Sequence, residues 1–405
     1  MKYYDVIIIG SGPAGLFTAI NCDDSNRVIV LEKNNVAGKK LLLSGAGQCN
    51  ITHEGNVEDF VKHYGEHGRF LKNALYRFNN NDLLDFFRKR KLEFISNDEG
   101  KVFPNTLKAS DVLDILIKEC NKRGVEINYN FCVTDISYNE EDKIFNVKSK
   151  GKKYKSSNLV IATGGNSYSY TGSTGDGYTL ASKLGHRIEE PLPALTPLYI
   201  KDYPFGDLSG ISFEDIPIYL WRNNKKIKET MGDILLTHKH ISGPGILNFS
   251  RYVNPNDVIK INFIGQKNIE GFRKEFIKDI QSNGKLLIKT LLKNYSIPKR
   301  FIDEILKIIG IDEKITCANL NKKLRNRLVM MLTEYPMTVE RLGEFNMAMV
   351  TKGGVSIREI NTKTMESKIV DGLYFVGEVI DIDGDTGGYN IQAAFSTAFV
   401  AGNTI

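Results

Sequence analysis

The feature that most constrains this chain is a glycine pattern near its start, Gly10-x-Gly12-x-x-Gly15. The pattern follows YYDVIIIG, a short β-branched run that predicts a buried parallel strand. It leads into SGPAGLFTAINC, which predicts a helix with Pro13 in its first turn. Between a strand and a helix, such glycines allow a tight turn, close approach of a pyrophosphate, and close helix packing. The sequence therefore predicts a dinucleotide-binding unit.

The next apolar run, RVIVLEK, predicts a second buried strand that ends at Glu32. A carboxylate at this place typically bonds the ribose hydroxyls of a bound adenosine. The helix N-terminus supplies amides and partial positive charge for the phosphates. A glycine turn with a chance glutamate is the alternative, but this motif by itself does not separate NAD from FAD.

Two distant segments favour FAD over NAD. LVIATGG (159–165) is a predicted strand that runs into a glycine turn, and GLYFVGEVIDIDG (372–384) places Glu378 directly after a glycine. An acidic residue there is typical of two-dinucleotide-fold flavoproteins, where it holds the ribitol, although aspartate is more frequent. DTGGYNIQAAFS then predicts a helix start whose amides stabilise negative charge on the pyrimidine edge of a reduced flavin. A glycine-started core helix is the alternative.

No second strand–GxGxxG–helix pattern occurs, so we predict no separate NAD(P)H domain and expect the nicotinamide to dock transiently. The formal net charge is +6, which permits contact with a polyanion without requiring it. The five cysteines show no regular spacing, the six histidines show no zinc-type spacing, and no apolar run is long enough for a membrane span. We therefore expect no metal, no membrane segment and a reducing, cytoplasmic location.

The dinucleotide-type pattern at both ends encloses a different pattern in the middle. Prolines in EEPLPALTPL indicate a boundary, short strands follow to about residue 265, and Lys-, Leu- and Ile-rich helices extend to about residue 312. We expect an α/β FAD domain at 1–190 and 340–405, a β-barrel-like domain at 191–267 and 313–339, and a helical domain at 268–312.

Several long stretches make the chain similar to a known family. They are GSGPAG, GKKLLLSGAGQCNIT, ATGGNSYSYTGSTGDGY, PLPALTPL, LLTHKHISGPGILNFS, KGGVSIREINTKTMESK and GLYFVGEVIDIDGDTGGYNIQAAFSTAFVAG. Together they resemble the YhiN-like bacterial flavoproteins, also called the aminoacetone oxidase family or NAD(P)/FAD-dependent oxidoreductases. The chain departs from the family at Gln48, where arginine is usual, at His53, where asparagine is usual, and at His240, where glycine is common. Loss of a cation at Gln48 would shift substrate preference if that arginine touches substrate or flavin.

The resemblance implies a glutathione-reductase-like, two-dinucleotide-binding FAD domain with an inserted β-barrel-like domain and a small helical domain. It also implies that the SGAGQCN turn lies against the isoalloxazine ring, with Lys40 and Ser44 near the phosphates or the ring. The expected FAD contacts are Gly10, Gly12, Pro13, Ala14, Gly15, Glu32, Lys33, Lys40, Ser44, Gly45, Asn50, Val133, Ala162, Thr163, Gly164, Gly377, Glu378, Gly388, Asn390, Ile391 and Gln392.

Three side chains are candidate catalytic groups. Cys49 is a candidate acid that protonates a carbon as hydride arrives, although a buried packing role is an alternative. His238 is a candidate proton donor or substrate contact, and alternation would place it and His240 on one face if their segment is a strand. Tyr389 is a candidate to stack on substrate, with a packed core tyrosine as the alternative.

The chemistry of the substrate stays open between classes. The resemblance includes a 23S ribosomal RNA dihydrouridine synthase, which reduces a uracil C=C bond. The basic stretches WRNNKKIK (221–228), KNYSIPKR (293–300) and KKLRNR (322–327) are compatible with RNA phosphates. Other family names imply a small-molecule enzyme, either an amine oxidase or an enone reductase. A flavin-binding redox sensor without turnover is a further alternative.

Overall fold

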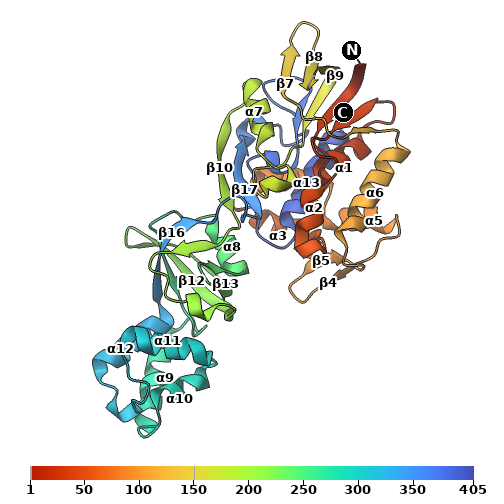
Figure 1. The fold of residues 1–405 in the computed structure, drawn as a ribbon. Helices are drawn as coiled ribbons and strands as arrows, with labels where there is room; N and C mark the ends of the chain where they lie inside the picture. Colours follow the sequence, from red (N-terminus) through yellow and green to blue (C-terminus); the bar gives the residue numbers. More distant parts are fainter. Residues whose placement is uncertain (1, 150) are drawn as a thin grey trace. The chain divides into compact units, whose positions relative to one another are not determined.

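The computed structural model describes residues 2–149 and 151–405. These residues form two compact units (Figure 1). Unit 1 comprises residues 1–194 and 345–405, and unit 2 comprises residues 195–344. The outer segments of the chain therefore share one unit, and the middle segment forms the other.

A parallel sheet is the centre of unit 1, as the β-branched runs predict. Its strands are β6 (Glu126–Asn128), β2 (Val28–Leu31), β1 (Lys2–Ile9), β9 (Lys152–Ile161) and β18 (Leu373–Phe375), and β18 pairs with the second half of β9. The first half of β9 pairs instead with β8 (Ile144–Ser149), which pairs with β7 (Asp135–Asn139) in antiparallel fashion. Strands β1 and β18, from opposite ends of the chain, thus flank β9. The predicted cofactor segments that follow these strands therefore belong to one sheet.

The helices that pack on this sheet bury the faces of their sequences that are apolar. Helix α1 (Pro13–Asn21) lies beside α13 (Tyr389–Gly402) and α6 (Ala109–Lys122), as Figure 1 shows. Helix α13 is buried along almost its whole length, in keeping with its small and apolar residues. Around them lie α2 (Lys39–Leu43), α3 (Val57–Lys62), α4 (Gly68–Arg77), α5 (Asn80–Arg88), α7 (Asp176–Lys183), β3 (Thr52–His53), β4 (Phe94–Ser96) and β5 (Lys101–Pro104).

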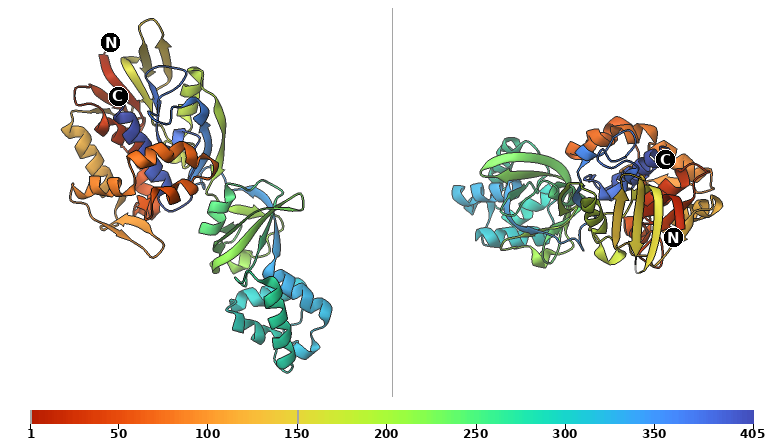
Figure 2. Two further views of the ribbon diagram at one scale, coloured as in Figure 1. Left: turned by 180° about the vertical axis from the view of Figure 1, so that it is seen from behind. Right: turned by 90° about the horizontal axis from the view of Figure 1, so that it is seen from above.

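Unit 2 contains a closed antiparallel barrel. Its strands, in barrel order, are β11 (Leu198–Ile200), β14 (Ile241–Ser242), β13 (Lys225–Leu236), β12 (Ser212–Arg222), β15 (Val258–Ile261) and β16 (Tyr335–Leu342). Helix α8 (Pro244–Ser250) packs on β13. The helices of unit 2 that follow the barrel strand β15 gather at one end of the barrel (Figure 1 and the left view of Figure 2). They are α9 (Ile269–Ser282), α10 (Ile288–Leu292), α11 (Lys299–Ile309) and α12 (Lys322–Thr333).

An aromatic core joins the barrel to these helices. The Phe301 ring of α11 lies 4.4 Å from the Phe263 ring and 4.9 Å from the Phe213 ring of β12, measured between centroids. The helices and the barrel share one hydrophobic cluster, which makes unit 2 a single folded body.

The boundaries differ from the sequence-based expectation in three places. Residues 191–194 belong to β10 (Ile188–Ala194), which pairs with β17 (Val350–Val355) in unit 1. Residues 340–344 belong to unit 2, because β16 continues to Leu342. Helix α12 lies within 313–339, which we expected to be barrel, because its buried face packs on α11.

Within the residues that the structure describes, no helix has both the length and the apolar character needed to cross a membrane.

Candidate active site

The glycine turn after β1 has the geometry that a pyrophosphate requires. A Cβ atom on Gly10 would lie 2.5 Å from the Ala162 carbonyl oxygen, and one on Gly15 would lie 2.0 Å from the Gly10 carbonyl oxygen. These two glycines are therefore needed for strand and helix to touch. A Cβ on Gly12, in contrast, would meet no atom within 4 Å. Gly12 thus borders open space at the start of α1.

The N-terminus of α1 presents its backbone amides to that space. Gly12 is the N-cap residue, no side chain caps the helix, and Pro13 occupies its first turn. The uncapped amides, including those of Ala14 and Gly15, and the partial positive charge of the helix end favour an anion. The turn therefore fits the pyrophosphate of FAD on grounds of shape and charge.

Glu32 lies at the end of β2, directly beside this turn, and is 7% exposed. Its carboxylate accepts hydrogen bonds from the amide and hydroxyl of Ser11, at 2.9 and 2.6 Å, and from the amide and side chain of Asn34, both at 2.8 Å. Four donors therefore hold the carboxylate in place without a bound ribose.

Further predicted FAD contacts lie on the segments that follow β2, β6 and β9. Lys33 pairs with Asp176, and Val133 is buried in the loop after β6. Ala162, Thr163 and Gly164 form the turn after β9, where Ala162 packs against Gly10 and Gly15. The structure thus brings these segments to one edge of the sheet.

The SGAGQC turn has an unusual backbone. Gly45, Ala46, Gly47 and Cys49 all have positive φ angles, between 55° and 89°. Two of them carry a side chain, and such residues cost free energy unless the surrounding structure holds them. Here the Cys49 amide donates to the Ser44 carbonyl oxygen at 2.9 Å. The turn is half-buried to exposed from Ser44 to Gln48, so its backbone is accessible to a flat ligand.

A partly buried ion pair joins α2 to the segment after β18. The Lys40 ammonium lies 2.7 and 2.9 Å from the two Glu378 carboxylate oxygens and 2.5 Å from the Ser167 hydroxyl. The same carboxylate accepts from the Thr351 amide at 2.9 Å. Gly377, which precedes Glu378, packs against Ala14 of α1. Lys40 and Glu378 therefore neutralise each other, and the Glu378 carboxylate is held by protein donors.

The start of α13 lies next to the SGAGQCNIT segment. Gly388 has a positive φ, and a Cβ there would lie 2.5 Å from the Thr52 carbonyl oxygen. Gln392 is fully buried and bonds Thr52, Phe78 and Ser396, so its side chain is used in structure. Asn390 bonds both the amide and the carbonyl of Gly384. Asn50 and Ile391 are half-buried in the same region.

The structure favours the packing alternative for Cys49 and Tyr389 and weakens the prediction for His238. Cys49 is 0% exposed, and burial raises the pKa of its thiol to about 12. No surface of the thiol is open to a ring or a substrate, which favours the packing role. His238 is exposed in unit 2, and it lies with His240 in a bend between β13 and β14, so the alternation expected for a strand does not apply.

Tyr389 is buried and stacks on protein rings. Its ring lies 4.0 Å from that of His63 and 5.1 Å from that of His53, in near-parallel planes. Burial, and then the charge of Asp385, raise the pKa of the Tyr389 hydroxyl. The tyrosine thus holds two histidines beside the Gly387–Gly388 turn.

Sequence reasoning missed a histidine–aspartate cluster. His63 Nδ1 lies 2.9 Å from Asp385 Oδ2, and His67 Nε2 lies 3.8 Å from Asp381 Oδ2. Burial raises the pKa of the Asp381 carboxyl, an effect that His67 opposes. The aspartates alternate in DIDGD, directly before the glycine turn, and this alternation was the available signal. The histidines lie between α3 and α4, more than 300 residues before the aspartates, so spacing alone did not connect the two sets.

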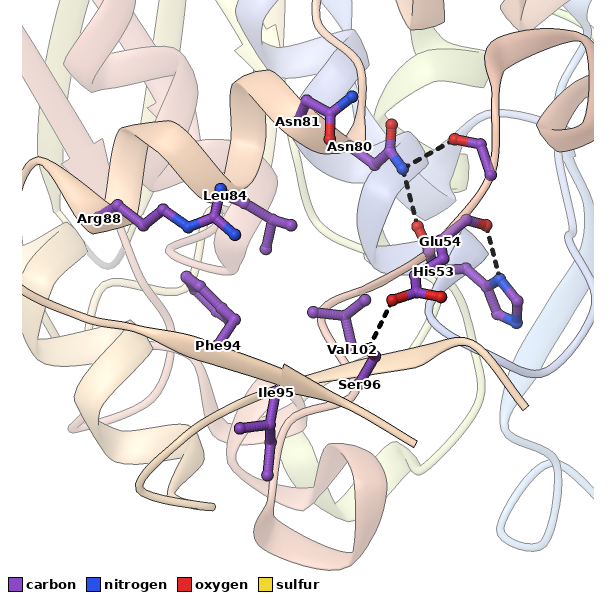
Figure 3. A pocket seen from close by; sticks show the side chains of 11 residues that line it. His53, Glu54, Asn80, Asn81, Leu84, Arg88, Phe94, Ile95, Ser96 and Val102 are labelled. Atoms are coloured by element: carbon purple, nitrogen blue, oxygen red, sulfur yellow. Dashed lines mark hydrogen bonds between the residues drawn. The ribbon is translucent and has the colours of Figure 1, made fainter. Parts of the chain in front are cut away.

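A separate pocket of about 270 Å³ lies between α5 and the β4–β5 hairpin (Figure 3). Asn80 donates to the carbonyls of His53 and Gly55 at its edge, and Glu54 accepts from Ser96. Its lining includes none of the predicted FAD contacts.

The open glycine turn, the fixed carboxylate and the parallel sheet form a Rossmann-type dinucleotide-binding fold. Together with the family and the relatives that follow, they make the chain an FAD-dependent oxidoreductase. The residues around the turn, the Lys40–Glu378 pair and the start of α13 are those that would hold FAD. The model of the HI0933-like protein Rossmann domain matches residues 4–404, so the chain belongs to the HI0933-like family.

Two of the relatives that match nearly the whole chain illustrate its similarity to known proteins. A ribosomal RNA dihydrouridine synthase of Haemophilus influenzae is 32% identical over 410 residues, covering 100% of this chain and 99% of the relative. A 3-dehydro-bile acid delta(4,6)-reductase of Clostridium scindens is 29% identical over 404 residues, covering 98% and 97%.

A solved structure confirms the fold. The 3-ketosteroid-delta4-(5alpha)-dehydrogenase of Rhodococcus jostii has a TM-score of 0.52 at 14% identity, covering 99% of this chain and 97% of that one. At this identity the likeness concerns the fold alone.

Proposed function

We propose that this protein reduces the C5=C6 bond of a uridine in ribosomal RNA, with electrons from NAD(P)H passed through FAD. We place this activity in the cytoplasm, where ribosomal RNA is found. The names of the two relatives described above support a reductase, since dihydrouridine synthesis and a delta(4,6)-reduction each saturate a C=C bond conjugated to a carbonyl.

The observation that carries the proposal is an accessible acid–base pair beside the predicted flavin site. When bound and reduced, FAD supplies a hydride to one carbon of the double bond, and a proton must reach the other carbon. His63 is 38% exposed at its side chain and lies against Tyr389, the first residue of α13. Oxidation of an amine would not require such a proton donor.

We assign proton delivery to His63 and its orientation to Asp385. The carboxylate of Asp385 fixes the imidazole through Nδ1, as expected for a histidine that transfers a proton. Tyr389 holds the same ring from its face at 4.0 Å. Cys49 is excluded from this role by its complete burial, and the proposal uses groups of unit 1 alone.

The test is a mass measurement on RNA. The protein is incubated with NADPH or NADH and ribosomal RNA from a strain that lacks the gene, and the nucleosides are analysed by mass spectrometry. We expect one uridine to gain the mass of two hydrogens. Flavin that is reduced by NAD(P)H while every uridine stays unchanged would contradict the proposal.

A second candidate is the reduction of a small-molecule enone, favoured by the 29% identity to the bile acid reductase. The same proton donor would serve it, because the bond that is reduced is also conjugated to a carbonyl. Turnover of a steroid dienone, with no change in RNA, would identify this alternative.

A further inference from the structure

The positive charge of the chain is concentrated in its helical part. Residues 268–334 contain 14 Lys and Arg residues and 8 Asp and Glu residues, a net charge of +6. This equals the net charge of the whole chain, so the rest of the chain has as many acidic as basic residues. A polyanion would therefore be attracted first to the segment that contains α9 to α12.

Helix α12 begins with four cations. Lys322, Lys323, Arg325 and Arg327 lie in its first two turns, and the first turn has no acidic residue. Lys323 and Arg327 are spaced i,i+4 and Lys322 and Arg325 are spaced i,i+3, so like charges are neighbours. The positive end of the helix dipole also disfavours cations here. In isolation this arrangement is electrostatically unfavourable.

No acidic group in the described part of the chain compensates for it. None of the four side chains forms an ion pair with any residue in 2–149 or 151–405. The Nε of Arg325 is enclosed and has no hydrogen-bond partner there. Lys322, Lys323 and Arg327 are exposed. The cluster is thus a set of available donors and charges.

In the other two basic stretches of the sequence, part of the positive charge is engaged with the protein itself. In 221–228, Arg222 pairs with Asp257 at 2.7 Å, Lys226 pairs with Glu229 at 2.8 Å, and Lys228 lies over the Tyr252 ring at 4.0 Å. In 293–300, Arg300 donates to the Asp207 carbonyl. These contacts leave 322–327 as the stretch best suited to an external anion.

We propose that the N-terminal half of α12, centred on Lys322, Lys323 and Arg327, binds the phosphate backbone of the RNA substrate. The inference rests on the function proposed above, because it presumes that RNA is the substrate. Residues at i and i+4 on a helix lie about 5–6 Å apart, which is close to the separation of successive phosphates on one strand. A basic face without base-reading groups would position RNA rather than specify its sequence.

The occupant is RNA rather than a membrane. A helix that lies on a membrane carries bulky apolar side chains beside its basic face. In the described part of α9 to α12, Met330 is the one large apolar side chain that is exposed. Charge without apolar surface therefore favours a soluble polyanion.

The test compares two triple charge reversals of the full-length holoprotein in a filter-binding assay with a 23S ribosomal RNA transcript. K322E/K323E/R327E reverses the α12 cluster. The matched control, K225E/K226E/K228E, makes the same charge change in the rival stretch of β13. The flavin-to-protein ratio and the melting temperature confirm that both variants are folded.

We expect the α12 variant to raise the apparent Kd at least about tenfold and to flatten the slope of log Kd against log salt by about 2–3. The control should change Kd by less than about threefold at the same salt concentration. Equal losses of RNA affinity in both variants, or no loss in the α12 variant, would overturn this inference. The proposed function would still stand if the wild-type protein reduces uridine. A wild-type protein that neither binds nor reduces RNA would overturn both.

Discussion

The substitution of Gly12 by alanine separates cofactor binding from folding. A Cβ at this position meets no protein atom within 4 Å, and its φ of −71° suits alanine. The methyl group would instead occupy the space in which we place the pyrophosphate. At Gly15, only three residues away, a Cβ would lie 2.0 Å from the Gly10 carbonyl oxygen. The two alanine variants should therefore fail in different ways.

The magnitudes follow from these contacts. A hydrogen bond to a charged group contributes about 1.5–3 kcal/mol, so loss of one amide–phosphate contact in G12A should weaken FAD binding about 10- to 100-fold. The free energy of unfolding of flavin-free G12A should differ from that of wild type by less than about 1 kcal/mol. Alanine is less favourable than glycine at an N-cap, but it also stabilises the fold by lowering the conformational entropy of the unfolded chain, and the two effects oppose each other. G15A forces the backbone apart and should lose about 3 kcal/mol or more.

The assay is a pair of measurements on flavin-free protein: a urea denaturation curve, and a titration with FAD followed by quenching of flavin fluorescence. Wild-type protein and both variants are compared under the same conditions. FAD affinity in G12A equal to that of wild type would refute the placement of the pyrophosphate. A loss of stability in G12A as large as that in G15A would refute the claim that Gly12 borders open space.

Other expectations follow from the same structure. E378Q leaves the Lys40 ammonium opposite a neutral amide, and both wild-type side chains are about four-fifths buried. We therefore expect the free energy of unfolding, measured with urea, to fall by about 2 kcal/mol. The double variant E378L/K40M, which removes both charges, should recover part of this loss. Burial lowers the pKa of His186, so the unfolded chain binds a proton at this side chain more readily than the folded chain. The contribution of His186 to stability should be complete above the unfolded-state pKa of about 6.5 and should fall as the pH drops below it. The urea midpoint should therefore decrease with falling pH in wild type, and H186N should reduce this decrease. H63Q should slow the reduction of uridine by about 10²–10⁴-fold in single-turnover kinetics. C49A should lower stability by about 1 kcal/mol with a far smaller effect on that rate, and the reverse result would return the acid role to the thiol.

The fold was predictable where local sequence and tertiary structure agree. The runs before Gly10 and around Glu32 are apolar and β-branched because both faces of a parallel strand are covered, so their pattern alone identified the sheet. The closing helix was predicted with its start at Tyr389, because a glycine turn and continuous small apolar residues indicate a buried helix.

The boundary after residue 190 was misplaced for a physical reason. Pro191 and Pro193 indicated the start of the next domain, yet both lie in β10 of unit 1. That strand pairs with β17 alone, and its register shifts between Glu189 and Leu192. A strand with one free edge and an irregular register tolerates proline, which a central strand does not.

The group to which we assign proton delivery could not be read from the sequence. His63 and Asp385 are 322 positions apart, and only the packing of α3 against the start of α13 brings them together. The place of Cys49 in the SGAGQC turn made it a candidate acid. Its positive φ of 61° and its complete burial are properties of the folded turn that the sequence does not show. A pattern locates a turn, whereas the direction in which a side chain points depends on tertiary contacts.

Anaerobic reoxidation of the flavin tests the central claim most directly. The purified protein is reduced with a stoichiometric amount of NADPH or NADH until its visible flavin absorbance is lost, and ribosomal RNA without dihydrouridine is then added. We predict that the absorbance returns in proportion to the RNA, and that RNA already carrying the modification has no effect. Protein that shows no flavin absorbance, or reduced flavin that unmodified RNA leaves colourless, would contradict the account.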